Sequence, residues 1–329
     1  MEIITDLSQF HLAGRTAVAI GKFDGIHKGH RILLQEILNR TDGLLSCVVT
    51  FDPLPEVYFG TLSGGVLSTR EEKRRAFDHM GVDFLVELPF QREIAGMEPE
   101  RFVREILCDK LHAAVIAAGP DLSFGDRGRG NFALLRRMEE ECGFRTTEIG
   151  KEEYQGQVIS STMIRELVRE GKMEDVTACL GMPYQILGTV LHGNAIGRTI
   201  GIPTVNQIPE ADKLLPPHGV YYSTVLLDGK EYPGMTNIGV KPTVSQTGAV
   251  TVETYLYDFR GDLYGRVITT SLLTFRRPEK KFSGIEELKK TMQEDLEAGR
   301  AYHDRLMSSP HTGLRQKGNP WQIRNEETT

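Results

Sequence analysis

Short apolar runs alternate with longer amphipathic stretches through the first half of the chain, and this alternation restricts the fold more than any other feature. The runs are residues 17–20, 44–51, 82–88 and 113–118, and the stretches with helical periodicity are residues 28–40, 68–80, 98–112 and 131–142. Strands that are apolar on both faces need cover on both faces, which helices on either side of a parallel sheet provide. We therefore predict an α/β domain with a Rossmann-like parallel sheet over residues 1–183.

The second half has the pattern of an antiparallel β domain. Residues 220–227, 250–259 and 266–275 are short strand-like runs, and the first of them ends at the turn sequence Asp228-Gly229. Closely spaced strands with glycine turns predict a sandwich or a small barrel. Glycine and proline at 181–183 interrupt the preceding helical stretch, so we place this domain at 184–307. Residues 308–329 show no periodicity and are expected to form a loose tail.

Capping boxes mark the starts of two predicted helices. Thr69 and Glu72 form the first, and Ser283 and Glu286 form the second. The helix after Ser283 carries an apolar stripe at Ile285, Leu288, Met292 and Leu296. A long helix is therefore expected to close the second domain.

Charge and cysteine content exclude several functional classes. The net charge of −6 is unfavourable for broad binding of a phosphate backbone, so no nucleic-acid partner is expected. The four cysteines, Cys47, Cys108, Cys142 and Cys179, lie far apart and fit thiols of a cytoplasmic protein. No apolar run approaches a membrane span and the N-terminus does not resemble a signal peptide, so no membrane association is expected. We expect a monomer or a weak homo-oligomer.

The sequence GKFDGIHKGH begins at Gly21, directly after the first apolar run, where a strand should give way to a helix. Helix N-termini bind phosphate through free N–H groups, and glycines allow a ligand to approach the backbone closely. His27 and His30 are three residues apart, so both can face one side, and imidazolium groups there could stabilise charge on a phosphate in transfer. Two alternatives are histidines of a surface helix and a zinc pair, although no cysteine or acidic partner has ligand spacing.

A second segment, ISSTMIRELVREGK at 159–172, has the same character. Ser160, Ser161 and Thr162 lie at the expected start of a helix, and Arg165 lies one turn further on. Hydroxyls, helix N–H groups and a guanidinium together suit phosphate, although an ordinary Ser/Thr N-cap is a simpler explanation of this segment alone. Two such segments without a Walker A sequence favour a nucleotidyl transferase over a P-loop enzyme.

The two segments together resemble the adenylyltransferase half of the prokaryotic bifunctional riboflavin kinase/FAD synthetase family, which has G-x-F-D-G-x-H-x-G-H followed by I-S-S-T-x-x-R. The resemblance implies that the N-terminal domain joins AMP from ATP to FMN, giving FAD and pyrophosphate, with His27 and His30 as catalytic residues. It implies that ATP is bound by Gly21, Phe23, Asp24, Gly25, His27, Gly29, His30, Ser160, Ser161, Thr162 and Arg165.

Two further segments of the first half resemble that family with departures. Residues 48–59 resemble its T-F-x-P-H-P segment, with Leu54 in place of histidine, and residues 117–131 resemble its flavin-side loop. In that loop Leu122 replaces Phe, Gly128 replaces Arg and Asn131 replaces Asp, while Arg127 and Arg129 flank the missing arginine. The resemblance implies flavin binding by Asp121, Phe124 and Gly125. The departures leave open a monofunctional riboflavin kinase with a degenerate first domain.

The second half resembles the riboflavin kinase part of the same family. GRTIGIPTVN at 197–206 is similar to its G-R-x-x-G-x-P-T-A-N signature, with Val205 for alanine, and four more family segments follow in order, at residues 219–225, 234–244, 252–265 and 275–282. The resemblance implies phosphorylation of riboflavin by ATP and Mg²⁺, with Glu253 as general base. The implied phosphate-binding residues are Gly197, Arg198, Gly201, Pro203, Thr204 and Asn206.

The residues themselves fit this chemistry. Transfer of a γ-phosphoryl group needs metal neutralisation, a phosphate cradle and a base near the hydroxyl. The Thr204 hydroxyl and the Asn206 amide are hard oxygen donors for Mg²⁺. Taken alone, PTVN reads as a turn and Glu253 as a solvated strand residue. Tyr221, Tyr255 and Tyr257 are expected to pack rather than stack on flavin.

Two functions from other classes remain open at this point. One is a flavin-binding regulatory protein with little turnover, against which the glutamate and PTVN argue. The other is a nucleotidyl transferase for a different phosphate compound such as phosphopantetheine, which explains the first half alone. The sequence therefore predicts an enzyme that makes FMN and FAD, with riboflavin, FMN and ATP as its small-molecule substrates.

Overall fold

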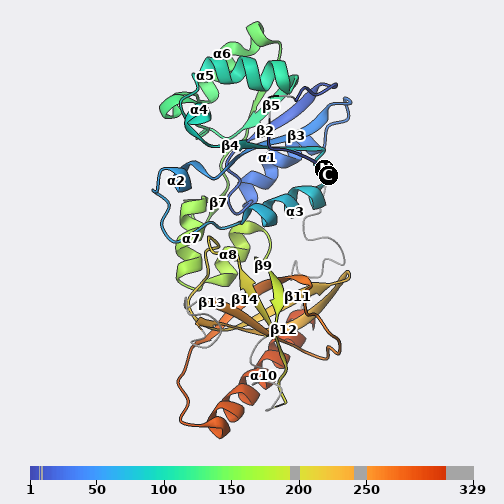
Figure 1. Ribbon diagram of the computed structural model, residues 1–329, viewed down its shortest axis with the longest axis vertical. Coiled ribbons are helices and arrows are strands. Elements are labelled where there is room, and N and C mark those ends of the chain that lie inside the picture. The colour runs from blue at the N-terminus through green and yellow to red at the C-terminus, as the bar shows by residue number, and fades with distance from the viewer. Residues whose placement is uncertain (7, 9, 193–200, 241–249, 309–329) are drawn as a thin grey trace. The chain divides into compact units, whose positions relative to one another are not determined.

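The computed structural model describes residues 1–6, 8, 10–192, 201–240 and 250–308 (Figure 1). The chain forms two compact units, which divide between Ser161 and Thr162. The first unit is an α/β domain with a parallel sheet, and the second contains an antiparallel barrel and a long final helix. The fold class predicted for each half is confirmed. The predicted tail at 308–329 lies, apart from Ser308, outside the described residues.

The sheet of the first unit has six parallel strands. They are β1 (Glu2–Ile4), β2 (Thr16–Ile20), β3 (Leu45–Asp52), β4 (Phe84–Pro89), β5 (Ala113–Ala118) and β6 (Arg145–Glu148). Their order is β1-β4-β3-β2-β5-β6, and every neighbouring pair is parallel. The four predicted apolar runs are the four central strands. The edge strands β1 and β6 were not predicted.

Helices cover both faces of this sheet, and the main ones match the predicted helical stretches. They are α1 (Lys28–Leu38), α3 (Arg70–Met80), α5 (Pro99–Arg101) continuing into the π-helix η1 (Phe102–Lys110), and α6 (Phe132–Cys142). Short elements lie between them: α2 (Pro55–Tyr58), α4 (Arg92–Ala95), the 3₁₀ turn η2 (Asp126–Gly128) and the hairpin of β7 (Glu153–Tyr154) and β8 (Gln157–Val158). Thr69 and Glu72 form the predicted capping box of α3.

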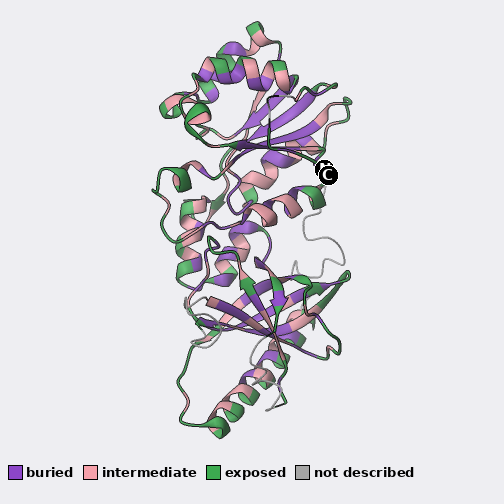
Figure 2. Ribbon diagram, in the orientation of Figure 1, coloured by how far each residue is buried: buried purple, intermediate pink, exposed green. Residues whose placement is uncertain are grey.

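Two hydrophobic cores lie on opposite faces of the sheet, whose strands are largely buried (Figure 2). Ala17 and Ala19 of β2 belong to the core that also contains residues of α1 and α3. Val18 and Ile20 belong to the core with η1 and α6. Successive residues of a strand point to opposite faces, so β2 must be apolar throughout.

Strand order creates a switch point beside β2. From β2 the chain proceeds through β3 to β4 on one side, and it then returns to β5 on the other side of β2. In open α/β sheets, ligands bind at the carboxyl ends of the strands, at the point where the connections from two adjacent strands go to opposite faces. The loops that follow β2 and β5 therefore lie at this switch point.

The second unit is built on a closed barrel. Its strands are β9 (Tyr184–Leu191), β10 (Thr204–Pro209), β11 (Gly219–Leu227), β12 (Lys230–Val240), β13 (Val250–Leu256) and β14 (Val267–Pro278). They close in the order β10-β13-β12-β11-β14-β9 with antiparallel neighbours. Asp228 and Gly229 both have positive φ in the tight β11–β12 turn, as a hairpin of this length requires.

In the described part of this unit, the helices that accompany the barrel are α7 (Ser161–Arg169), which starts at the unit boundary, α8 (Met173–Leu180) and α10 (Ile285–Ser308). Gly181 ends α8 in the left-handed conformation, as the Gly-Pro interruption predicted. The cap before α10 differs from the prediction. Ser283 pairs with Glu287 rather than Glu286, because the helix begins at Ile285, later than a Ser283 N-cap would start it. Ile285 is 56% exposed, so the apolar stripe begins after it.

Buried polar contacts hold α10 against the barrel. The Arg277 guanidinium pairs with buried Asp295 at 2.7 Å, the Tyr257 hydroxyl donates to the Leu296 carbonyl at 2.8 Å, and a ring nitrogen of His303 lies 3.1 Å from the Gly234 carbonyl. Met292 and Leu296 pack against Val220, Tyr222 and Met235. The helix is therefore fixed along its length to one face of the barrel.

Gly299 tests this docking. A Cβ at this position would meet the Tyr257 hydroxyl and lie 2.9 Å from Cε1 of Tyr222. We expect Gly299→Ala to lower the free energy of unfolding by about 1–2 kcal/mol, because overpacking of about 1–3 kcal/mol and a disturbed hydrogen bond outweigh a helix-propensity gain of about 1 kcal/mol. Gly284→Ala is the matched control, because no atom lies within 4 Å of its Cβ position. Denaturant unfolding measures both, and equal stabilities would contradict this account.

Candidate active sites

The loop from Gly21 to His30 leaves the carboxyl end of β2 beside the switch point. Phe23, Gly25 and Ile26 have positive φ angles of 52°, 90° and 43°, which is uncommon for residues with side chains. Phe23 and Ile26 are almost fully buried, and the Phe23 ring packs edge-on against Phe77 at 5.5 Å. Side-chain burial therefore holds the loop in a conformation that the backbone alone would avoid.

His27 and His30 stack on one another at the start of α1. Their ring centroids are 3.7 Å apart with an interplanar angle of 21°, and His30 also contacts Phe23 at 5.2 Å. The side chains are half-buried, and the Nδ1 atom of each is buried without a hydrogen-bond partner in the described chain. The prediction that both can face one side is consistent with this geometry. Two orphaned ring nitrogens at a helix start can donate to a bound anion in the tautomer that places the proton on them.

The charge state of these histidines differs from the sequence-based expectation. Burial lowers the pKa of His27 to about 4, although the nearby Asp121 carboxylate acts in the opposite direction. Burial and the neighbouring His27 lower the pKa of His30 well below its ordinary value. The expected imidazolium groups are therefore neutral imidazoles in the unliganded site at pH 7. The electrostatic effect of Asp121 on His27 links the loop after β5 to the loop after β2.

Asp24 connects the loop to two other segments. Its buried carboxylate accepts a hydrogen bond from the Ser68 backbone N–H at 3.0 Å, and its carbonyl accepts one from the Ser161 hydroxyl at 2.8 Å. The structure thus brings Ser161 to the loop, with half-buried Ser160 beside it. Thr162 and Arg165 belong to α7 of the second unit, where Thr162 is exposed and Arg165 half-buried.

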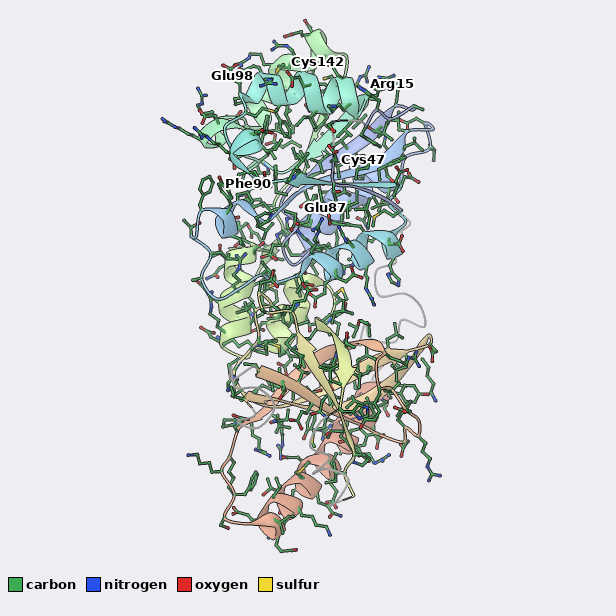
Figure 3. All side chains as sticks on the ribbon, viewed as in Figure 1. Arg15, Cys47, Glu87, Phe90, Glu98 and Cys142 are labelled. Atoms are coloured by element: carbon green, nitrogen blue, oxygen red, sulfur yellow. The ribbon has the colours of Figure 1, made fainter. Side chains whose placement is uncertain are left out.

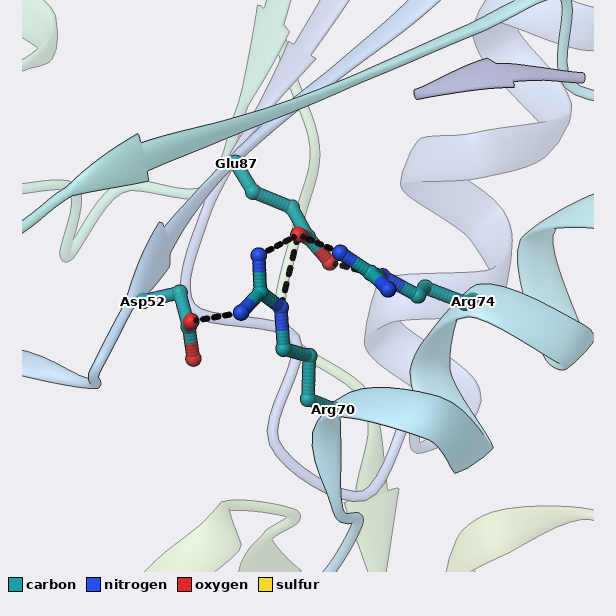
Figure 4. Close-up of polar contacts among 4 residues, drawn as sticks. All are labelled: Asp52, Arg70, Arg74 and Glu87. Carbon is teal, nitrogen blue, oxygen red and sulfur yellow. Dashed lines mark hydrogen bonds and ion pairs between the residues drawn. The ribbon is translucent and has the colours of Figure 1, made fainter. Parts of the chain in front are cut away.

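An ion-pair cluster lies at the carboxyl ends of β3 and β4 (Figure 4). Arg70 and Arg74 of α3 each form an ion pair with buried Glu87, with N–O distances of 2.6 Å. Arg70 also pairs with Asp52 at 2.9 Å. The arginines hold the pKa of Glu87 below its usual range even though burial acts to raise it. Two planar guanidiniums on one carboxylate fix the first turns of α3 against the sheet.

The expected flavin loop after β5 is held by its own packing. Phe124 is buried, and its ring centroid lies 5.1 Å from that of Phe102. Gly125 has a φ of 70°, and a Cβ at this position would lie only 2.9 Å from the Met97 carbonyl oxygen, so a larger residue does not fit. Asp121 is exposed and lies 3.5 Å from Lys151. The Asn131 side chain caps α6 through the Leu134 N–H. The structure therefore gives Phe124 and Gly125 a role in loop conformation and leaves Asp121 accessible.

Exposed aromatic rings beside α2 were not predicted. Phe59 is 62% and Tyr58 44% exposed, and their ring centroids lie 5.8 and 5.5 Å from that of Phe90, each edge-on. Phe90 is labelled in Figure 3. Leu54, which stands where the family has histidine, is buried at the start of α2. The hydrophobic sequence VYF at 57–59, which follows Pro55 and Glu56, was the available signal for this surface.

In the second unit, strand register brings the predicted kinase residues together. Glu253 of β13 lies opposite Asn206 of β10 on one side and opposite Asn237 of β12 on the other. Thr204 and Tyr255 form the adjacent pair on the same face. Directly opposed side chains have Cβ atoms about 4.5–5.5 Å apart, close enough to act on one ligand. Asn237 was missed, because only register reveals it.

The opposite face of these strands fills the barrel. Gln207, Val252 and Ile238 alternate with the polar row and are completely buried. The amide of Gln207 donates to the Ile268 carbonyl at 3.0 Å. PTVN is therefore the start of a strand rather than the turn that the residues alone suggested, and it presents Thr204 and Asn206 to the outside of a rigid wall.

A cavity of about 510 Å³ lies between this outer face and α10. Gly201, Ile202, Tyr255 and Tyr257 line it from the barrel side, and α10 contributes polar residues including Lys289 and Arg300. Tyr221 is fully buried with its hydroxyl on the Pro217 carbonyl, as expected of a packing residue. Tyr257 also packs as expected, with its hydroxyl on the Leu296 carbonyl, and both Tyr255 and Tyr257 border the cavity. Gly197 and Arg198 lie outside the described residues.

The donor set on β10 fits a hard cation. The Thr204 hydroxyl and the Asn206 amide are two residues apart on one strand face, both half-buried, and Glu253 adds a carboxylate beside them. Mg²⁺ prefers oxygen ligands and retains waters or phosphate oxygens in its remaining positions. Within the described ranges, no group of three His, Cys, Asp or Glu side chains is placed to hold a metal ion.

Sequence comparisons match both halves. Residues 10–163 match the FAD synthetase family, and residues 180–303 match the riboflavin kinase family. A Listeria monocytogenes bifunctional riboflavin kinase/FMN adenylyltransferase is 34% identical over 88% of this chain and 93% of its own length. The chain belongs to the bifunctional riboflavin kinase/FMN adenylyltransferase family. The Escherichia coli K12 member is 36% identical over 89% of this chain and 94% of its own length. The family resemblance inferred from the motifs is confirmed.

A solved structure supports the fold assignment. The crystal structure of a Streptococcus pneumoniae protein, described as a macrolide-efflux protein, aligns with a TM-score of 0.77 and 27% identity over 91% of this chain and 98% of that chain. In the part of this chain that the structure describes, no helix has both the length and the apolar character needed to cross a membrane.

The low pKa of His27 predicts a pH dependence of stability. Below its ordinary pKa of 6.5 the unfolded chain binds a proton that the folded site does not bind until about pH 4. This group should therefore reduce stability as the pH falls through that window, by up to about 1.4 kcal/mol per pH unit. We expect His27→Gln to lose less stability than the wild type between pH 6.5 and 4. Denaturant unfolding across this range measures the difference, and parallel curves would contradict the assignment.

Proposed function

We propose that this chain makes both flavin cofactors. The second domain phosphorylates riboflavin with ATP to give FMN, and the first domain joins AMP from a second ATP to FMN, releasing pyrophosphate and FAD. The observation that carries the proposal is the pairing of two family matches in one chain, each over a separate half with its own cluster of phosphate-type residues. The Listeria monocytogenes and Escherichia coli relatives match 88% and 89% of this chain, so one family accounts for both halves.

In adenylyl transfer, a phosphate oxygen of FMN attacks the α-phosphorus of ATP and the bond to pyrophosphate breaks. We assign the contacts to ATP to the Gly21–His30 loop, to the free N–H groups at the start of α1, and to Ser160 and Ser161, with Thr162 and Arg165 completing the set. The neutral rings of His27 and His30 can each donate one N–H to a phosphate oxygen. Bound phosphate would raise their pKa values, so positive charge develops only when the anion arrives.

In riboflavin phosphorylation, the 5′-hydroxyl oxygen attacks the γ-phosphorus of ATP and ADP leaves. We assign the uptake of the hydroxyl proton to Glu253, which lies between Asn206 and Asn237. A loose transition state asks little of the base, so an ordinary carboxylate suffices. The cavity bordered by Tyr255 and Tyr257 lies next to this row and is the proposed place of the flavin.

Mg²⁺ is the proposed metal, held by Thr204 and Asn206 together with phosphate oxygens. When bound, it neutralises charge on the phosphates of ATP. Gly197, Arg198, Gly201 and Pro203 are proposed to shape the phosphate cradle of the kinase. We also propose a domain boundary near residue 183, a cytoplasmic location and a monomeric or weakly associating chain.

One alternative has specific support. A kinase whose first domain has lost FAD synthesis would explain why Leu54, Gly128 and Asn131 depart from the family. Asn131 nevertheless caps α6, and the histidine pair and Asp24 keep an ordered arrangement. These features favour the bifunctional reading.

A time course separates the two readings. The pure protein is incubated with riboflavin, ATP and Mg²⁺, and the flavins are separated by chromatography. FMN should appear first and then give way to FAD. FMN that accumulates without FAD would support the monofunctional kinase, and the absence of both products would refute the enzyme assignment.

Glu253→Gln should separate the activities from the kinase side. The amide keeps the shape of the carboxylate but cannot take up the hydroxyl proton, so FMN formation should fall by about 10²-fold or more. Formation of FAD from supplied FMN should remain within twofold of wild type. Chromatography with each flavin substrate measures both rates. Equal losses in the two assays would show that the residue does not act in the kinase step alone.

His30→Asn should impair the adenylyltransferase activity and leave the kinase activity intact. Removal of one ring of the stacked pair deletes a donor to the phosphates, so FAD formation should fall by about 10²-fold or more. FMN formation from riboflavin should be unchanged. Unaltered FAD output would remove His30 from the catalytic machinery.

A further inference from the structure

Lys22 is a cation within the loop from Gly21 to His30 whose role no motif defines. The pattern G-x-F-D-G-x-H-x-G-H leaves its position open, so the family resemblance assigns nothing to it. The residue follows Gly21 at the carboxyl end of β2, at the switch point of the sheet. Ligands of parallel α/β sheets bind at this edge, so a charged side chain here is a candidate for contact with a substrate.

The backbone of Lys22 is held against the neighbouring strand β3. The Gly21 N–H donates to the Val49 carbonyl, and the hydroxyl of buried Thr50 donates to the Lys22 carbonyl, each at 3.1 Å. The next residue, Phe23, is fully buried with a positive φ. The base of the lysine side chain therefore has a defined place, and its flexible stem sets how far the ammonium can move.

The Lys22 ammonium forms an ion pair with the carboxylate of Glu56, in the first turn of α2. The Lys22 side chain is 43% exposed and that of Glu56 is 35% exposed. Ion pairs between groups this exposed are weak, because water competes for both charges. The pair thus keeps a cation beside the loop before substrate binds, and a phosphate oxygen can replace the carboxylate at little cost.

Adenylyl transfer gains from a cationic donor at this place. The phosphate of FMN must approach the α-phosphate of ATP, and a fixed donor at the reacting phosphates stabilises the charge that develops there. The low pKa values of His27 and His30 leave both rings neutral before substrate binds.

Arg70 and Arg74 are less suited to this task than Lys22. Both form ion pairs with Glu87, whose side chain is only 2% exposed. Their movement toward a substrate would leave a buried carboxylate without its partners, which is costly. The movement of Lys22 would leave only a partly exposed carboxylate, which water can solvate.

We propose that Lys22 is a phosphate-binding residue of the adenylyltransferase site, whose ammonium leaves Glu56 and donates a hydrogen bond to a phosphate oxygen of ATP or of FMN. This role rests on the proposed adenylyltransferase function. It makes the two partners of the ion pair unequal, because Lys22 binds the substrate whereas Glu56 competes with the substrate for Lys22. An ion pair that only fastened α2 to the loop would make the two residues equivalent.

Lys22→Met and Glu56→Gln test this inequality. In Lys22→Met we expect kcat/KM for FAD formation from FMN to fall by about 10- to 10²-fold, the range for loss of one hydrogen bond to a charged group. Glu56→Gln should retain or raise kcat/KM, because it removes the competing carboxylate. FMN formation from riboflavin, measured on the same proteins, should be unchanged in both variants.

Two further variants serve as controls. Lys22→Arg keeps a cation that can bind phosphate, so its FAD formation should exceed that of Lys22→Met. Arg104→Met removes a cation from another ion pair of the same unit, which joins η1 to Glu141 of α6 with both side chains exposed. This variant should form FAD at the wild-type rate, because such pairs contribute little.

The KM values of Lys22→Met identify the phosphate. The KM for ATP is measured at saturating FMN, and the KM for FMN at saturating ATP. A rise in the KM for ATP assigns the contact to the triphosphate, and a rise in the KM for FMN assigns it to the flavin phosphate.

The outcomes separate the role of Lys22 from the function on which it rests. Wild-type FAD formation by Lys22→Met, or equal losses in Lys22→Met and Glu56→Gln, would overturn the role of Lys22 and leave the adenylyltransferase function standing. A wild-type chain that forms FMN but no FAD would overturn that function. A loss in Lys22→Met that is absent from Glu56→Gln and smaller in Lys22→Arg supports the proposal.

Discussion

The position of β2 between β3 and β5 is the constraint on which the first unit depends. Helices that follow these strands cover opposite faces, so the carboxyl ends of β2 and β5 form a switch point, the place where ligands bind in parallel α/β sheets. The loop after β2 supplies the stacked histidines, and the loop after β5 supplies Asp121, whose charge acts on His27. Residues about 100 positions apart in the sequence thus meet because of strand order.

Burial of His27 and His30 has an electrostatic consequence. An unliganded site that held two imidazolium rings 3.7 Å apart would contain two buried like charges, which the protein avoids by keeping both rings neutral. We expect ATP to bring its own charge to the site, so hydrogen-bond donors in fixed places matter more there than resident positive charge. Arg70 and Arg74 form ion pairs with Glu87, and Arg70 also pairs with Asp52. These two arginines therefore hold α3 against the sheet.

The elements that the sequence predicted well are those whose pattern is set locally. The four central strands are continuous apolar runs because they are buried on both faces, and Thr69 with Glu72 caps α3 within four residues. The edge strands β1 and β6 have short, mixed sequences, so their pairing depends on the sheet already being present. The shift from Glu286 to Glu287 at α10 reflects where the helix begins, which packing decides.

Two features of the candidate sites depend on the tertiary structure and could not be predicted from the sequence: the charge state of the histidines and the position of Asn237. The spacing of His27 and His30 showed that they could share a face, but their neutral state follows from burial by Phe23 and the rest of the loop. Asn237 joins Glu253 only through the β12–β13 register. Motifs therefore identify the candidate site residues, whereas a partner such as Asn237 becomes visible only when the strand register is known.

The two predicted sites are held in place in different ways. The predicted kinase residues lie on neighbouring strands of a closed barrel with a buried interior face, so strand pairing sets the register of Thr204, Asn206 and Glu253. The loop after β2 has left-handed residues and no strand pairing of its own, so its conformation relies on buried side chains and on the hydrogen bond that the Asp24 carboxylate accepts from Ser68. This loop therefore depends on contacts from distant segments, whereas the register of the barrel strands follows from their pairing.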